Sequence, residues 1–291
     1  MRMSIQTREV LSHIIRSGYK IDLVRHPEAW SAHIFHPQIQ GISSEDIYGG
    51  TAKVKEIAIS KAVSEFVERQ AFYEKSRTDV ISDSTGFSAR PRSSRISLAK
   101  TKTKWSSKLE AMERYYAFHW WEDHSVSHAI RVIDTINFNL FIGLGIKDKF
   151  KKAFLIQVGT PGFEDVLVLI GMLPYQGFAV GCAAGWAWER DQTLFRACVE
   201  LMRHYHIIEK LTSSNDEPSS LYTKKLLHLA SGSLDQDLLD RLESKGNKKC
   251  RKPRAIIDEE VPHQFSKLYY VHRFCFEDQP DILNQWNNII I

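Results

Sequence analysis

The sequence predicts a mixed α+β fold, and three of its features support this prediction. Segments with apolar residues at every third or fourth position alternate along the chain with short apolar segments of strand type. The 291 residues are 43% hydrophobic and 25% charged, so the chain can bury a full core. An uncharged stretch at 166–188 contains Pro174 and Gly177, whose turn chemistry divides it into two buried strands. We therefore expect sheets packed against helices, in a single domain over residues 1–291.

Three long helices are predicted from the spacing of apolar residues. They cover residues 55–75, 96–121 and 191–210. Between the first two lies DSTGFSARPRSS, which is rich in turn residues and predicts a loop. Strands are expected at residues 133–140, 154–158, 166–173, 178–188 and 268–276. A polar linker at 211–220 precedes a pair of short helices and a basic run.

Bulk composition excludes several classes of protein. A net charge of +4 is too small for this length to favour a nucleic-acid or membrane surface. The four cysteines lack CxxC spacing, which fits reduced thiols better than a disulfide framework or a zinc site. The stretch at 166–188 is long enough to span a bilayer, but its central turn favours two strands. The N-terminal residues are polar and charged rather than a signal peptide, so we expect a cytoplasmic protein without a membrane span.

A short motif, ExxER, occurs twice in the chain. The copies are Glu65, Glu68 and Arg69, and Glu110, Glu113 and Arg114. At average residue usage, roughly 0.07 chance copies are expected in a chain of this length. Because residues three and four apart share a helix face, each copy places two carboxylates and a guanidinium side by side. A third segment repeats these spacings with Arg196, Glu200 and Arg203.

The motif has two interpretations. Charges at such spacings are the usual pattern of a solvated helix face. Both copies, however, lie in apolar helices that end in aromatic runs, FVERQAFY and ERYYAFHWW, which predicts partial burial. Converging buried carboxylates require cations to stay ionised, and oxygen ligands of this kind favour Mg²⁺. Bridging ions and arginines could then hold a polyphosphate.

The segments around the motif resemble the nucleotide-binding motifs of the YcaO superfamily. In order, they are SKAVSEFVER, DSTGFSA, KLEAMERYYAFHWW, GCAAG and RACVELMR, and they lie within residues 49–203. The resemblance implies a YcaO-like fold, in which sheets pack against helices that carry the ATP-binding glutamates, and ATP and Mg²⁺ as cofactors. It assigns magnesium and phosphate to Glu65, Glu68, Glu110, Glu113 and Glu200. It places Arg69, Ser84, Thr85, Arg114 and Arg203 at the nucleotide as well. Residues 211–291 would complete the fold.

The sequence departs from this family's pattern at four points. Lys61 stands where relatives usually have Ser, Tyr115 where an acidic residue commonly follows ER, and Arg203 where Gln is usual. The chain ends in WNNIII, whereas related cyclodehydratases often end in a Pro-rich tail. These departures leave open a non-catalytic YcaO-like scaffold that binds nucleotide without turnover.

The chemistry that the resemblance implies is activation of a peptide backbone amide. A nucleophile adds to the carbonyl, and ATP phosphorylates the resulting oxygen, which then leaves as phosphate. We expect cyclodehydration of Cys, Ser or Thr to azolines in a ribosomally made peptide. Thioamidation with a TfuA-like partner is the enzymatic alternative, and no general base can be assigned from the sequence.

The expected partners follow from the same resemblance. Besides the precursor peptide, we expect a ThiF-like or winged-helix protein that binds the leader peptide and meets the basic segment at 90–108 or the apolar end at 274–291. A homodimer is left open, and no nucleic-acid partner is expected. His119, His124 and His128 have a spacing that zinc could use, although packing or capping explains them more simply.

Overall fold

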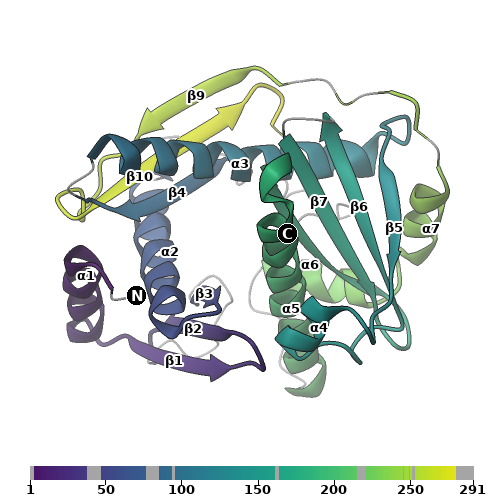
Figure 1. Cartoon of the computed structure of the whole chain (residues 1–291), viewed down its shortest axis with the longest axis horizontal. Coiled ribbons are helices and arrows are strands. Elements are labelled where there is room, and N and C mark those ends of the chain that lie inside the picture. The colour runs from purple at the N-terminus through teal and green to yellow at the C-terminus, as the bar shows by residue number, and fades with distance from the viewer. Residues whose placement is uncertain are drawn as a thin grey trace. The chain divides into compact units, whose positions relative to one another are not determined.

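The protein is described by a computed structural model in which the chain forms two compact units. The structure describes residues 3–37, 47–76, 85–93, 96–160, 164–214, 221–244, 246–248, 250 and 253–279. Unit 1 comprises residues 1–111 and 254–279, and unit 2 comprises residues 112–253 and 280–291. The expected α+β class is confirmed, because helices and antiparallel sheets occur in both units (Figure 1).

Unit 1 contains two three-stranded antiparallel sheets. Strands β1 (Lys20–Arg25), β2 (Trp30–Phe35) and β3 (Tyr48–Ala52) form one sheet in that order. Strands β4 (Gly86–Pro91), β10 (Tyr269–Phe276) and β9 (Ala255–Glu260) form the other, with β10 in the centre. The helices of the unit are α1 (Ile5–Arg16), α2 (Lys55–Ser76) and the first part of α3 (Ile96–Glu122).

The core of unit 1 forms around α2. Ala62, Phe66 and Ala71 are buried, as their helical spacing predicts. They belong to a cluster with Ile14 of α1 and Val271 of β10. Burial of these side chains places the opposite face of α2, which carries the charged residues, toward the unit's surface.

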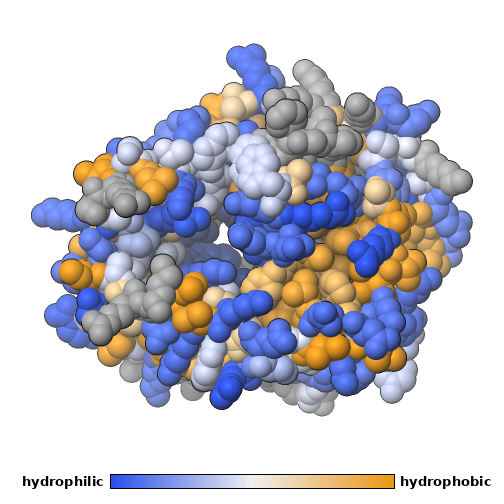
Figure 2. Space-filling view, viewed as in Figure 1, coloured by the Kyte–Doolittle hydropathy of each residue, from blue (hydrophilic) through white to orange (hydrophobic). Residues whose placement is uncertain are grey.

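Unit 2 is built on the four-stranded antiparallel sheet β5-β6-β7-β8. Its strands are β5 (Ala129–Ile133), β6 (Lys152–Thr160), β7 (Glu164–Met172) and β8 (Phe178–Trp186). The helices are the rest of α3, α4 (Asn139–Leu144), α5 (Arg190–Ser214), α6 (Leu221–Ala230) and α7 (Asp235–Glu243), with a short 3-10 turn, η2 (Ala187–Glu189). Helix α5 packs along β8 and β7. Figure 2 shows apolar residues over the part of the face where Figure 1 draws this sheet, and the edge strand β5 exposes Ile130 and Val132.

The end of α3 in unit 2 is held by a buried arginine. Arg241 of α7 has no exposed surface and donates to the carbonyl oxygens of Trp120 and Val126. Its guanidinium also lies over the Trp120 ring, 4.9 Å from the centroid. The Trp120 carbonyl lies in the last turn of α3, where the helix itself supplies no partner, so a side chain supplies one.

The three long helices begin and end within a few residues of the predicted bounds, and the hairpin at 166–188 is confirmed. The strand predicted at 133–140 is wrong. Strand β5 ends at Ile133, because the Asp134 carboxylate accepts from the backbone N–H groups of Ile136 and Asn137 and turns the chain. The following apolar residues form α4, which ends at Gly145 in the left-handed conformation.

The loop predicted at DSTGFSARPRSS is also wrong in part. Residues 86–91 form β4, which pairs with β10 in the register Ala89↔Val271. The pairing partner lies far away in the sequence, so local turn propensity could not show it. No helix in the described part of the chain is long and apolar enough to cross a membrane.

Candidate functional site

Three of the predicted carboxylates share one mode of attachment. An Oε2 atom of each accepts a hydrogen bond from a backbone N–H of a neighbouring strand. Glu65 accepts from Gly49 at 2.9 Å, Glu110 from Phe87 at 3.0 Å, and Glu113 from Ala184 at 3.2 Å. The three glutamates are partly buried. Hydrogen bonds to the charged form favour ionised carboxylates in fixed orientations.

Glycines explain how strand backbones come close enough to make these bonds. A Cβ atom on Gly50 of β3 would collide with the backbone of α2 at Ala58 and Ala62. A Cβ atom on Gly86 of β4 would collide with the backbone of α3 at Ser107 and Ala111. Each glycine adjoins the residue whose N–H binds the carboxylate, so the missing side chain brings donor and acceptor together.

In unit 2, glycines likewise allow the strand β8 to approach the helix α5 closely. A Cβ atom on Gly181 would collide with the carbonyl oxygen of Ala197, and one on Gly185 would collide with the Thr193 hydroxyl. Between these glycines, Ala184 donates its N–H to Glu113 of α3 and accepts from Arg196 of α5 at 2.8 Å. The small residues of GCAAG thus let one strand residue, Ala184, bind both α3 and α5.

Unit 1 therefore carries one group of candidate site residues. Besides accepting from Gly49, Glu65 forms an ion pair with Arg69 at 4.0 Å on α2, and the Arg69 side chain is 40% exposed. Glu68 lies one turn along α2 from Glu65 and is partly buried. The Lys61 ammonium donates to the carbonyl oxygen of Thr51 at 2.9 Å, so this departure from the family pattern links α2 to β3.

Unit 2 carries the second group, in which Glu200 is the centre. Its Oε2 atom lies 3.4 Å from Nη1 of Arg203, and its Oε1 atom lies 3.2 Å from Nε2 of His204. Burial raises the pKa of Glu200, but the charges of Arg203, His204 and Arg114 outweigh it and hold the pKa well below its usual range. Glu200 is therefore a carboxylate that its own unit neutralises.

Cys182 of β8 is partly buried near the carboxylates of this group. Burial and the negative charges of Glu113 and Glu200 raise the pKa of its thiol well above the ordinary value. The thiol stays protonated at neutral pH and is not a nucleophile in this state.

The remaining predicted positions have other roles or fall outside the description. Thr85 is buried and its hydroxyl contacts the thiol of Cys275. Ser84 lies outside the described residues. Tyr115 is buried, with its ring 4.3 Å from that of His119, so a core aromatic occupies the position where the resemblance predicts an acidic residue.

The donor chemistry of the two groups fits magnesium and phosphate. No three His, Cys, Asp or Glu side chains within the described ranges lie close enough together to hold a metal ion. Mg²⁺ commonly takes one or two protein carboxylates and completes its coordination with phosphate oxygens and water. Oriented carboxylates such as Glu65, Glu110 and Glu113 suit that mode, because each is held by a backbone N–H. Convergence of the five predicted glutamates on one site stays a prediction, since they are divided between two units.

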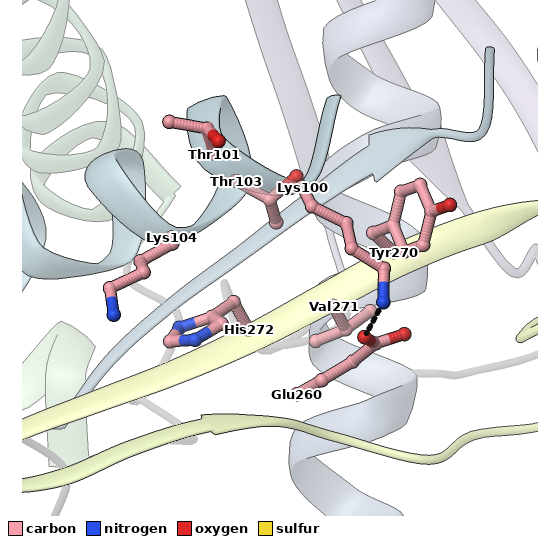
Figure 3. A pocket seen from close by; sticks show the side chains of 8 residues that line it. All are labelled: Lys100, Thr101, Thr103, Lys104, Glu260, Tyr270, Val271 and His272. Atoms are coloured by element: carbon pink, nitrogen blue, oxygen red, sulfur yellow. Dashed lines mark ion pairs between the residues drawn. The ribbon is translucent and has the colours of Figure 1, made fainter. Parts of the chain in front are cut away.

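The basic segment at 90–108 is largely paired within unit 1. Lys100 lies 2.8 Å from Glu260, Lys104 lies 2.5 Å from Asp258, and Arg92 lies 3.3 Å from Glu260. Figure 3 shows Lys100 and Glu260 beside a cavity of about 240 Å³ between α3 and the β4-β10-β9 sheet. These acids of β9 reduce the positive charge that the sequence places on this segment.

Among the described residues, His119, His124 and His128 belong to no group of three side chains that could hold a metal ion.

Sequence reasoning missed several residues of the two groups. They are His204, which lies beside Glu200, and the glycines next to the residues that donate to the carboxylates. Small residues such as those of GCAAG were visible in the sequence. A run of Gly and Ala in a strand is a signal of close backbone approach, and it could have pointed to this packing.

Comparison with known proteins shows the fold. No protein-family model and no curated protein matches the chain. Among solved structures, YcaO from Methanopyrus kandleri bound with AMPPCP and Mg²⁺ is similar, with a TM-score of 0.59 and 12% identity over 97% of this chain and 92% of that one. A chain of the E. coli microcin synthetase McbBCD complex with pro-MccB17 bound is similar too, with a TM-score of 0.57 and 10% identity over 87% and 86%. The YcaO resemblance found in the sequence is thus confirmed at the level of the fold.

Proposed function

We propose that this chain is a YcaO-type enzyme that uses ATP and Mg²⁺ to activate peptide backbone amides, most directly for azoline formation. The main support is the attachment of Glu65, Glu110 and Glu113 to strand backbone at the positions that match the family's motifs. The neighbour from Methanopyrus kandleri was solved with AMPPCP and Mg²⁺, and the same fold in this chain is compatible with that ligand pair.

The residues of the chain suit the charge changes of such a reaction. The addition of a Cys, Ser or Thr side chain to an amide carbonyl gives an oxyanion, and its phosphorylation makes the oxygen a good leaving group. Bound magnesium would neutralise the phosphate charge as the phosphoryl group is transferred. Glu65, Glu68, Glu110 and Glu113 would hold magnesium ions, each ion taking one or two of these carboxylates together with phosphate oxygens. Arg69, Arg114 and Arg203 would contact the remaining phosphate oxygens.

Metal binding should depend on nucleotide if this proposal is right. Because no all-protein metal group exists among the described side chains, phosphate oxygens must complete the coordination. We expect calorimetry to show weak binding of Mg²⁺ alone, weak binding of ATP in EDTA, and tight binding when both are present. The proposal would be excluded if ATP bound equally tightly with and without EDTA, or if ATP did not bind at all.

Turnover separates the enzymatic proposal from the non-catalytic scaffold. The chain is mixed with a candidate precursor peptide, ATP and Mg²⁺, and the peptide mass is followed. Loss of one water mass per modified residue indicates an azoline, and exchange of oxygen for sulfur in the presence of a sulfide donor indicates the thioamide. Nucleotide binding without hydrolysis under any of these conditions would favour the scaffold.

We also propose that the chain works with a partner that binds the leader peptide. The McbBCD neighbour was solved as a complex with pro-MccB17 bound, which supports a partner for this chain as well. A ThiF-like or winged-helix partner is expected, or a TfuA-like protein if the product is a thioamide. Efficient modification by the isolated chain would contradict this dependence.

A further inference from the structure

The cavity of unit 1 is a candidate binding site that the proposed function does not use. It lies between α3 and the β4-β10-β9 sheet, and the residues that line it include Lys100 and Lys104 of α3, Glu260 of β9 and His272 of β10 (Figure 3). None of the lining residues belongs to the candidate nucleotide group. Lys100 is about 15 Å along the axis of α3 from Glu110, so the two sites are separate.

The size of the cavity limits its ligand. Its volume is about 240 Å³. One water molecule needs roughly 10–15 Å³, whereas pockets for drug-sized molecules and cofactors measure about 300–1,000 Å³. The cavity therefore suits a group of the size of one amino-acid side chain rather than a whole nucleotide.

Two lysines supply positive charge to the cavity. Lys100 and Lys104 are one helical turn apart, so they share a face of α3, and both side chains are about half exposed. Figure 3 shows both side chains extending from the helix toward the strands. A ligand that enters the cavity can therefore meet both ammonium groups.

These lysines keep hydrogen-bond donors for a ligand. Lys100 lies 2.8 Å from Glu260, and Lys104 lies 2.5 Å from Asp258. Within the described ranges, each ammonium group makes this one ion pair. Because an ammonium group has three N–H donors, a single carboxylate partner does not use them all.

Both oxygens of each acid, in contrast, already have a partner. The second oxygen of Asp258 lies 3.2 Å from Nε2 of His272, and the second oxygen of Glu260 lies 3.3 Å from a guanidinium nitrogen of Arg92. Burial lowers the pKa of His272, so its ring adds no charge at pH 7. A cationic ligand would have to displace an existing partner, whereas an anion can use the donors that the lysines keep.

The balance of charge favours an anion with a single charge. Asp258 and Glu260 face three cations in these pairs, so one positive charge is in surplus on this face of the sheet. Glu259 points to the opposite face, where it pairs with Lys75 and Arg273. A carboxylate carries the charge that balances the surplus, whereas a phosphate dianion would exceed it and be repelled by the two acids.

We propose that the cavity beside Lys100 and Lys104 binds a carboxylate group of the size of an aspartate or glutamate side chain. The carboxylate accepts hydrogen bonds from both ammonium groups. Two sources offer this group, a free small acid and an acidic residue of a peptide. The inference does not depend on the proposed function, because it involves neither nucleotide nor magnesium.

The probe is glutamate capped at both backbone ends, so that its side-chain carboxylate is its single charge, and capped glutamine is the neutral control. Binding to the full chain is followed by NMR, as shifts of the backbone amides at 100–104 and 270–272. We expect saturable shifts with capped glutamate and a dissociation constant on the order of 1–10 mM, because half-exposed ion pairs each contribute little. Capped glutamine should give no saturable shift.

Three variants locate the site. Lys104→Gln should weaken the binding of capped glutamate about fivefold, because it removes one of the two ammonium groups. Glu260→Gln should tighten the binding, because it removes a negative charge beside the ligand and leaves Lys100 without its ion pair. Lys102→Gln is the matched control, since Lys102 is exposed on the same helix and does not line the cavity. It removes the same charge and should leave the affinity unchanged.

A peptide with one glutamate between glycines, titrated beside capped glutamate, distinguishes the two sources. Tighter binding of the peptide indicates an acidic residue of a peptide, and equal affinity indicates a free small acid. The inference is overturned if capped glutamate gives no saturable shift or binds no better than capped glutamine. Equal weakening by Lys102→Gln and Lys104→Gln, or weaker binding in Glu260→Gln, also overturns it, because the lysines would then act only as unspecific surface charge.

Discussion

At the scale of single residues, the carboxylates of the two units do more than carry charge. Each of the three attached to strands accepts a backbone hydrogen bond, so it contributes to the packing of a strand on a helix. Charge and hydrogen bonding can be removed separately, because Gln keeps an acceptor oxygen and Leu does not. This difference allows a site role to be told from a structural one at the same position.

Glu110 provides the first prediction at this scale. Glu110→Gln should abolish Mg²⁺-dependent ATP binding while the fold stays intact or becomes slightly more stable without metal, because repulsion between carboxylates is relieved. Glu110→Leu should lose binding as well, and it should also lose about 1–2 kcal/mol of stability, because the Phe87 N–H is left without its acceptor. Urea unfolding and calorimetry of both variants test this. Equal stability of the two variants, or ATP affinity retained in Glu110→Gln, would contradict it.

His263 provides a second prediction, on pH dependence. The ring is 9% exposed, and burial lowers its pKa from 6.5 to about 4. The unfolded chain therefore binds a proton more readily than the folded one. The contribution to stability is complete above pH 6.5 and falls by about 1.4 kcal/mol per pH unit as the pH drops toward 4.

The variant His263→Asn should remove this dependence. The Nδ1 atom of His263 accepts from the N–H of Phe265 at 3.2 Å, and the Asn side-chain oxygen can take its place. Urea unfolding at pH 7 and pH 5 should show a larger loss for wild type than for the variant, by roughly 2 kcal/mol. Parallel losses in the two proteins would show that His263 is not responsible.

At the scale of elements, glycines determine how closely a strand approaches a helix. Gly86→Ala should force β4 away from α3, because the added Cβ would meet backbone atoms of Ser107 and Ala111 that cannot move aside. We expect a loss of about 1–3 kcal/mol together with weaker ATP binding, since the bond from Phe87 to Glu110 would lengthen.

Gly171→Ala is the matched control for this prediction. It lies in β7, and the three atoms nearest its Cβ would all belong to the buried ring of Phe150 rather than to a backbone that holds a candidate carboxylate. We expect a loss of stability with unchanged ATP affinity of the folded protein. Equal effects of the two variants on ATP binding would show that the approach of β4 to α3 does not position Glu110.

At the scale of the whole molecule, one helix belongs to both units. The boundary between the units falls within α3, after Ala111. Leu109 is buried in the part that belongs to unit 1, and Met112, Tyr116 and Trp120 are buried in the part that belongs to unit 2. Unfolding of either unit would remove the packing from half of a continuous helix.

The chain should therefore unfold in a single transition, as the expected single domain requires. Scanning calorimetry should give a calorimetric enthalpy close to the van't Hoff enthalpy, because the shared helix couples the units. ATP with Mg²⁺ should raise the melting temperature of the whole transition. Two separate transitions, with only one shifted by ligand, would show that the units are independent domains.

The sequence by itself determined the local structure and the chemistry of the motifs. Helical spacing located α2, α3 and α5 and placed their glutamates on shared faces, because both depend on residues a few positions apart. The turn at Pro174 and Gly177 located the β7-β8 hairpin for the same reason. Only the tertiary structure decided that residues 86–91 form a strand, since their partner β10 is distant in the chain.

The tertiary structure likewise decided the partners of the charged residues. Long-range packing decides which strand N–H binds Glu65, Glu110 and Glu113. It also decides how the basic segment is paired with acids of β9, and it brings Arg114 of α3 close enough to Glu200 of α5 to lower its pKa. The sequence alone does not show whether a backbone amide, an arginine or a metal ion will stabilise the negative charge of a given carboxylate. The electrostatic and hydrogen-bond energy that decides the role of each carboxylate comes from neighbouring groups, and the fold brings those groups close.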